Sequence, residues 1–315
     1  MKDLRDALAE YVTVRRALGS QLRWPGSALR RFVDFLHREG ATFITTDLAV
    51  RWAGEPAGVQ RATRAARLSM VRRFAAWLSV FDPRTQVPPA GLLAACHRRS
   101  IPYIYTDQEI ESLMAEAARL PSPKGLRAQT HVTLIGLLAA TGLRSGEALA
   151  LDARDVDLQN GILSIRQTKF GKSRFVPLDE TTRVALAHYA GRRDEVLRRR
   201  RSDAFLVSER GTRLQHCTTR RTFAKLSCAI GLRTPVGNRR IGRGPRLHDL
   251  RHTFATRRLI EWYRAGLDVE RELPKLATYL GHVQVAYTYW YIQAVPELLR
   301  LATERCSTGQ GGGAR

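Results

Sequence analysis

Apolar residues recur at helical spacing through the first part of the chain. The clearest stripe lies in 59–79, where arginines surround the apolar side of the expected helix, and another lies near 27–38. A single arginine on such a face is an ordinary solvated residue, but together these arginines suit contacts with phosphates. The pattern predicts a helical N-terminal domain over residues 1–85.

Prolines and other loop residues cluster in 81–91, and a second break lies at 100–110. These breaks predict an interdomain linker over 86–105. Thr106 and Glu109 have the spacing of a capping box, which predicts a helix from about 107 to 119. A second domain is expected over 106–302, followed by a disordered tail over 303–315.

The second domain combines helical segments with one pair of strands. The remaining expected helices lie near 127–140, from about 145, and over 181–200, 217–230, 248–265, 271–280 and 295–305. The segments 161–167 and 173–178 predict two strands joined by a turn, and 234–246 is expected to be a Gly/Arg-rich loop. The expected fold class is mainly α with a small antiparallel β-sheet.

The formal net charge of +23 and the pI of about 11.0 indicate a polyanionic partner. Residues 1–100 carry 17 Lys and Arg against 8 Asp and Glu, and the remainder carries 35 against 21, so both halves are basic. A ribosome-associated basic protein would share this signature. No apolar run approaches the ~20 residues that span a bilayer, and acidic residues interrupt the N-terminus. We therefore expect no membrane partner and a location in the bacterial cytoplasm or nucleoid. The four cysteines are widely spaced, which disfavours a disulfide framework or a zinc ribbon.

Four short segments in the C-terminal two-thirds carry residues suited to phosphate chemistry. They are TGLRSGEALAL (141–151), TKFGKSRFVPL (168–178), HDLRHTFA (248–255) and YLGHVQVAYTYWYI (279–292). The candidate cations and histidines in them are Arg144, Lys169, His248, Arg251 and His282, followed by a group of tyrosines. Cations around a reactive tyrosine suit an enzyme that cuts and rejoins DNA through a covalent protein link.

The order, spacing and residue types of these segments resemble the tyrosine recombinase (phage integrase) family over about 105–300. The N-terminal helices more weakly resemble that family's core-binding domain. The resemblance implies a SAM-like core-binding domain and an α+β catalytic domain of the DNA breaking-rejoining type. It also implies site-specific recombination through a 3′-phosphotyrosyl intermediate, without metal, ATP or another cofactor. The implied partners are double-stranded DNA at specific sites and a homotetramer on two such sites, with or without other recombinases.

The resemblance gives each candidate a role. Arg144 and Arg251 hold the scissile phosphate, for which the bidentate guanidinium is suited. His248 assists proton transfer, and His282 donates a hydrogen bond to the phosphate. Lys169 is the general acid for the leaving 5′-oxygen, although Lys172 competes for that role.

Each of these residues also has a structural interpretation. Arg144 and Glu147 could form a helix-surface pair at i, i+3 spacing, and His282 could be a packed histidine. His248 and His252 have H-x-x-x-H spacing, which raises a zinc site. Asp249 stands where the metalloprotease pattern needs Glu, so we expect no metal.

The nucleophile must be chosen among Tyr287, Tyr289 and Tyr291. The family places its tyrosine nine residues after the box histidine, which implies Tyr291, and Thr288 matches a threonine usual three residues before it. A phenol with pKa ~10 is a weak nucleophile at neutral pH, but nearby cations favour its phenolate.

The sequence motifs L-P-x-L-x-x-Y-L-G-H and T-Y-W-Y resemble those of the transposon-borne branch of the family. An Xer-type chromosome resolvase is the rival within the family. A type IB topoisomerase and a catalytically silent DNA-binding protein are rivals outside it. The helix expected at 295–305 could dock on a neighbouring protomer or pack on its own domain.

Overall fold

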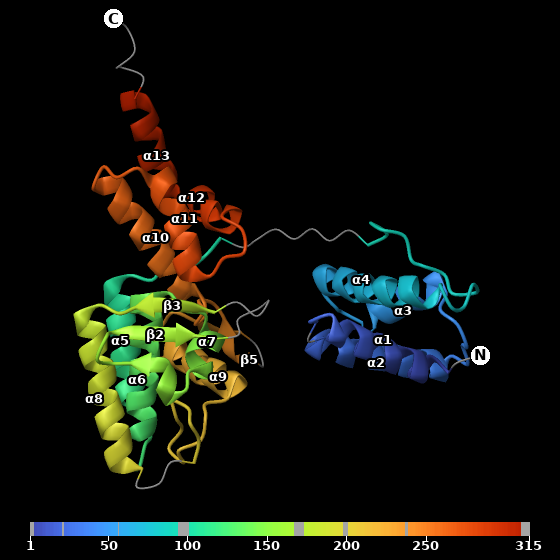
Figure 1. Ribbon diagram of the computed structural model, residues 1–315, viewed down its shortest axis with the longest axis horizontal. Coiled ribbons are helices and arrows are strands. Elements are labelled where there is room, and N and C mark those ends of the chain that lie inside the picture. The colour runs from blue at the N-terminus through green and yellow to red at the C-terminus, as the bar shows by residue number, and fades with distance from the viewer. Residues whose placement is uncertain are drawn as a thin grey trace, which may run out of the picture. The chain divides into compact units, whose positions relative to one another are not determined.

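The computed structural model describes residues 3–20, 22–55, 57–93, 101–166, 173–197, 201–236 and 239–309. The chain divides into two compact units, Met1–Ser100 and Ile101–Arg315 (Figure 1). Helices dominate both units, and the strands form small antiparallel sheets in the second. The predicted fold class is therefore confirmed. No helix in the described ranges is long and apolar enough to cross a membrane.

The first unit is built from helices packed around an aromatic-rich core. These helices are α1 (Leu4–Ala17), α2 (Arg23–Arg38), α3 (Thr46–Gly54) and α4 (Arg61–Leu78). Phe32 of α2 and Phe74 of α4 are fully buried, and Tyr11 packs against Phe74 with ring centroids 5.3 Å apart. The helices predicted at 27–38 and 59–79 thus coincide with α2 and α4.

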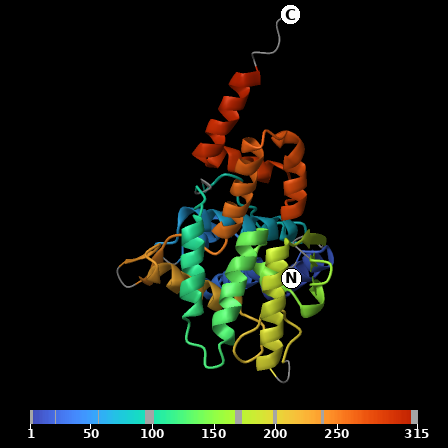
Figure 2. The ribbon, with the colours of Figure 1, turned by 90° about the vertical axis from the view of Figure 1, so that its left-hand side faces the viewer.

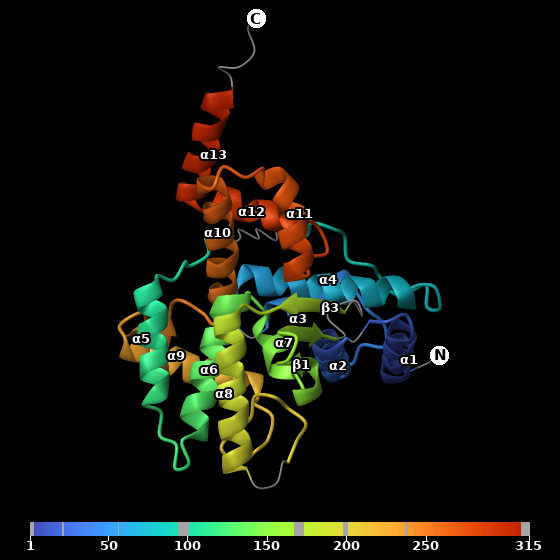
Figure 3. The same ribbon diagram turned by 60° about the vertical axis from the view of Figure 1, so that its left-hand side comes forward.

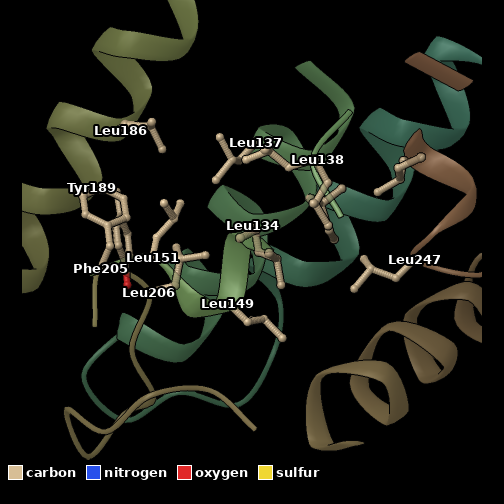
Figure 4. Close-up of a cluster of buried hydrophobic side chains, with 14 of the residues drawn as sticks. Leu134, Leu137, Leu138, Leu149, Leu151, Leu186, Tyr189, Phe205, Leu206 and Leu247 are labelled. Carbon is tan, nitrogen blue, oxygen red and sulfur yellow. The ribbon is translucent and has the colours of Figure 1, made fainter. Parts of the chain in front are cut away.

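The core of the second unit is a row of helices, α5 (Asp107–Ala118), α6 (Leu126–Thr141) and α8 (Glu180–Val196), with α6 between the other two (Figure 2). Leu134 and Leu138 of α6 are nearly inaccessible and join a cluster with Leu186 and Tyr189 of α8 (Figure 4). The predicted capping box starts α5. In it, the Glu109 amide donates to Thr106 Oγ1 (3.1 Å) and the Thr106 amide donates to the Glu109 carboxylate (2.8 Å).

A three-stranded antiparallel sheet follows α6 and the short helix α7 (Ser145–Ala150). Its strands are β1 (Val156–Asp157), β2 (Ile162–Ile165) and β3 (Arg174–Pro177), in that order. Leu163 pairs with Val176, and both are fully buried, so alternate residues face the core. The two predicted strands are β2 and β3, whereas β1 was not expected. Lys169 and Lys172 lie outside the described residues.

The C-terminal part of the second unit contains α9 (His216–Ala229), α10 (Asp249–Arg264), α11 (Val269–Leu280), α12 (Ala286–Ala294) and α13 (Pro296–Gly309). Helices α10 to α13 gather at one end of the unit (Figure 3). The helix α12, which carries the tyrosine segment, was not predicted, because its run of aromatic residues shows no polar face.

Two expectations for this part are wrong. The supposed loop 234–246 contains the paired strands β4 (Thr234–Val236) and β5 (Arg239–Arg243), consistent with the strand preference of its β-branched residues. The supposed disordered tail from 303 is helical as far as Gly309. Glu304 and Arg305 are good helix formers, and Arg300 forms an i, i+4 ion pair with Glu304.

Candidate active site

The predicted site residues come from separate elements of the second unit. Arg144 precedes α7, His248 and Arg251 begin α10, His282 follows α11 and Tyr291 lies in α12. The described members converge at the end of α11. The predicted Lys169 lies outside the described residues.

Both arginines are fixed by backbone carbonyls at helix ends. Arg144 donates to the Gly281 carbonyl (2.8 Å), while Arg251 donates to the carbonyls of Leu280 (2.7 Å) and Gly142 (3.0 Å). The last carbonyls of a helix lack intrahelical partners and carry partial negative charge. Gly142 and Gly281 end α6 and α11 in the left-handed conformation (φ 60° and 68°), which presents these carbonyls to the arginines.

Glu147 joins two guanidinium groups. Its carboxylate accepts hydrogen bonds from Arg144 (2.7 Å) and from both terminal nitrogens of Arg174 (2.8 and 3.1 Å), and only 9% of its side chain is exposed. Burial opposes ionisation of Glu147, but Arg174 and then Arg144 hold its pKa below the usual value. Arg174 also donates to the Tyr279 carbonyl (2.8 Å), so this residue links β3 to α7 and α11.

Arg251 is a buried cation at the centre of the site. Arg251 is 2% exposed, and no carboxylate within the described part of the chain forms an ion pair with it. Burial, followed by the nearby charge of Arg144, lowers the pKa of Arg251 to about 10, so it stays protonated at neutral pH. Burying such charge is costly unless an opposite charge accompanies it. The arrangement therefore favours an anion.

The tyrosines of α12 differ in their surroundings. Tyr291 is 2% exposed, whereas Tyr287 and Tyr289 are each 42% exposed. The Tyr291 hydroxyl lies 3.0 Å from His252 Nδ1. The Tyr291 ring also stacks near His282, with 6.4 Å between ring centroids.

Comparison with known proteins identifies the family of this chain. Residues 104–297 match the profile described as the phage integrase family. The chain belongs to this family. It is therefore a tyrosine recombinase, an enzyme that cleaves and rejoins DNA at specific sites.

Relatives of this tyrosine recombinase cover nearly its whole length. It is 43% identical to y4rB of Sinorhizobium fredii, a protein named as an integrase/recombinase, over 97% of each chain. It is 30% identical to the tyrosine recombinase XerD of Caulobacter vibrioides, over 93% of this chain and 92% of XerD. The fold also matches the Tn1549 transposon integrase in complex with transposon right-end DNA, with a TM-score of 0.67 and 17% identity. The match covers 97% of this chain and 100% of that chain.

Two histidines of the recombinase are electrically neutral at pH 7. Burial, followed by the charges of Arg251 and Arg144, lowers the pKa of His282 to about 3. Burial and Arg251 likewise lower the pKa of His248. His282 Nδ1 lies 2.8 Å from the hydroxyl of Thr288, which is itself fully buried. This contact fixes the ring between α11 and α12.

A hollow of about 600 Å³ lies beside His248. Its cationic and histidine lining residues are His216, Arg220, Arg221, Arg233, Arg246 and His248. A hollow with this lining suits the sugar-phosphate backbone of the DNA on which the recombinase acts.

Sequence reasoning missed two residues of the site. Arg174 lies in the K-x-R-x-V-P motif, of which only the lysine was considered as a site residue. The motif shows that an arginine is present there, but it does not show what the arginine contacts. His252 was considered only for zinc, yet its ring contacts the Tyr291 hydroxyl. The sequence signal for a role of His252 in the site was its position four residues after His248, which is about one helical turn. In the described ranges, no group of three or more His, Cys, Asp or Glu side chains is placed to hold a metal ion.

Proposed function

We propose that this recombinase cuts DNA through a 3′-phosphotyrosyl intermediate in which Tyr291 is the nucleophile. The observation that carries the proposal is the buried cation Arg251, which lacks a carboxylate partner among the described residues and lies in the same site as the buried Tyr291. A scissile phosphate would supply the missing negative charge. The tyrosine oxygen would then attack phosphorus and the 5′-oxygen would leave.

Arg144 and Arg251 would stabilise the negative charge that develops on the phosphate oxygens. His248 would assist proton transfer, and neutral His282 would donate a hydrogen bond to the phosphate without adding charge of its own. Lys169, or else Lys172, would protonate the leaving 5′-oxygen. The bond energy stays in the phosphotyrosine, so strand rejoining needs neither ATP nor a metal ion.

We further propose that the protein acts as a homotetramer on two DNA sites and mobilises its own element. The 43% identity with y4rB, named as an integrase/recombinase, supports an integrase over a resolvase. The 30% identity with XerD keeps chromosome resolution as the alternative. Either activity would take place in the bacterial cytoplasm.

Strand exchange between two labelled duplexes tests this function. The duplexes carry the DNA that flanks the protein's own gene, and the buffer contains EDTA and no ATP. Recombinant products are expected, and they should disappear in Tyr291→Phe but persist in Tyr289→Phe. Relaxation of supercoiled DNA without exchange would instead indicate a topoisomerase.

A further inference from the structure

His252 occupies a position that neither a phosphate contact nor a zinc site explains. It lies on α10 one turn after His248, and its side chain is 15% exposed. Its ring packs between His248 (5.0 Å between centroids), Trp290 (5.7 Å) and Tyr291 (5.5 Å). From there its Nδ1 atom reaches the Tyr291 hydroxyl at 3.0 Å, a hydrogen-bond distance.

The other ring nitrogen of His252 faces a carboxylate. His252 Nε2 lies 4.0 Å from Asp249 Oδ1, and Asp249 is almost completely buried. The Arg246 amide donates to Asp249 Oδ2 (2.7 Å), which fixes the carboxylate. Negative charge beside Nε2 favours the tautomer that carries its proton there. Nδ1 is then the acceptor, and the Tyr291 hydroxyl is the donor.

We propose that His252 is the general base that activates Tyr291 for DNA cleavage, with Asp249 as the residue that orients and stabilises it. The inference rests on the proposed role of Tyr291 as nucleophile. A nucleophile in contact with a base, and the base beside a third group, is the arrangement that nucleophilic enzymes share.

The step conserves atoms and charge. The Tyr291 proton moves to His252 Nδ1, and the freed oxygen lone pair forms the bond to phosphorus. The bond from phosphorus to the 5′-oxygen breaks, and the general acid of the site protonates that oxygen. Rejoining reverses each transfer, so His252 returns its proton to the tyrosine.

His282, the other histidine whose ring stacks near Tyr291, is less suited to this role. His282 Nδ1 is engaged with Thr288, and a pKa of about 3 makes its ring a weak proton acceptor. The groups that face His252 are Asp249 and His248 on α10, Tyr291 on α12 and His282 after α11.

Single-turnover cleavage of a nicked suicide duplex tests the proposal. Both His252→Ala and His252→Asn should cleave about 10²- to 10⁴-fold more slowly, because neither side chain takes up a proton. Asn still offers a hydrogen-bond acceptor, so a near-wild-type rate in His252→Asn would overturn the role as base. His188→Asn, on the exposed face of α8, is the matched control and should keep the wild-type rate.

A second substrate separates the base from the general acid. In it, sulfur replaces the bridging 5′-oxygen, and a thiolate leaves readily without a proton. Cleavage by the double variant Lys169→Ala, Lys172→Ala should recover on this substrate, whereas cleavage by His252→Asn should stay slow. Full recovery by His252→Asn would assign His252 to the leaving group and overturn the proposal.

The DNA-free protein gives an independent reading. Nitrogen-15 NMR should show His252 Nδ1 unprotonated at neutral pH, with a chemical shift that changes in Tyr291→Phe. A protonated Nδ1, or no change in Tyr291→Phe, would overturn the inference. If instead the wild type forms no adduct while the NMR result holds, the proposed function fails and the His252–Tyr291 contact stands.

Discussion

At the scale of single residues, the site depends on Glu147, which holds two guanidinium groups in place. The carboxylate is 9% exposed and bonded to Arg144 and Arg174. Removing its charge would leave two neighbouring cations without their carboxylate, and the side chain of Arg174 is only 11% exposed. Because the two cations repel each other and Arg174 is poorly solvated, the arrangement would lose both stability and geometry.

We predict that Glu147→Gln lowers the free energy of unfolding by about 3 kcal/mol. The exposed Glu195, paired with Arg192 at i, i+3, offers a control of the same substitution. Glu195→Gln should change the free energy by less than about 1 kcal/mol. Equilibrium denaturation of the two variants makes the comparison, and equal losses would argue against the buried network.

His282 gives the folded protein a dependence on pH. Its pKa falls from the usual 6.5 to about 3 because of burial and the neighbouring arginines. Below pH 6.5 the unfolded chain takes up a proton at His282 that the folded chain does not, so stability falls as the pH falls. Between pH 6.5 and 5, His282→Asn should lose less stability than the wild type. Denaturation curves at several pH values measure the difference, and parallel losses would contradict it.

At the scale of elements, the turn after α11 aligns the site. Gly281 has φ 68°, and a Cβ atom there would lie 2.8 Å from a terminal nitrogen of Arg174. Arg174 cannot easily move, because Glu147 and the Tyr279 carbonyl hold it. The glycine is thus required by its backbone conformation and by a close side-chain approach.

Gly281→Ala should therefore destabilise the protein more than Gly266→Ala. Gly266 has a similar φ of 71°, but a Cβ there meets no atom within 4 Å, so it carries only the backbone strain. That strain costs about 1 kcal/mol, and the clash at Gly281 adds to it. The midpoints of thermal unfolding of the two variants make the comparison. Equal shifts in the midpoint temperature would show that the Arg174 side chain moves aside without cost.

The sequence predicts the elements well where one local signal decides. Thr106 and Glu109 predict the start of α5, and alternation predicts β2 and β3. Prediction from the sequence fails for α12, whose aromatic run has no polar face, and for the extension of α13 to Gly309. Contacts such as Arg174 with Glu147 depend on the tertiary arrangement, so spacing alone does not reveal them. The roles of the site residues stay predictions.

At the scale of the whole molecule, the net charge of +23 suits a protein that binds DNA. Each phosphate contact releases counterions, so affinity falls as the salt concentration rises. Arg220 is exposed in the basic hollow beside His248, whereas Arg192 is exposed on α8 and paired with Glu195.

Arg220→Ala should weaken DNA binding and reduce the slope of log K against log salt by about 1, because one phosphate contact is lost. Arg192→Ala should leave both quantities unchanged. Fluorescence anisotropy at several salt concentrations measures them. An equal effect of the two variants would mean that the hollow is not a DNA contact.

The central claim is that Tyr291 forms the covalent bond to DNA, and mapping of the adduct tests it most directly. The protein is incubated with nicked duplexes that carry the DNA flanking its own gene, in EDTA, and the covalent product is digested and sequenced by mass spectrometry. We predict a nucleotide attached through its 3′-phosphate to Tyr291, with no adduct in Tyr291→Phe. Attachment to Tyr287 or Tyr289, or an adduct that persists in Tyr291→Phe, would contradict the account.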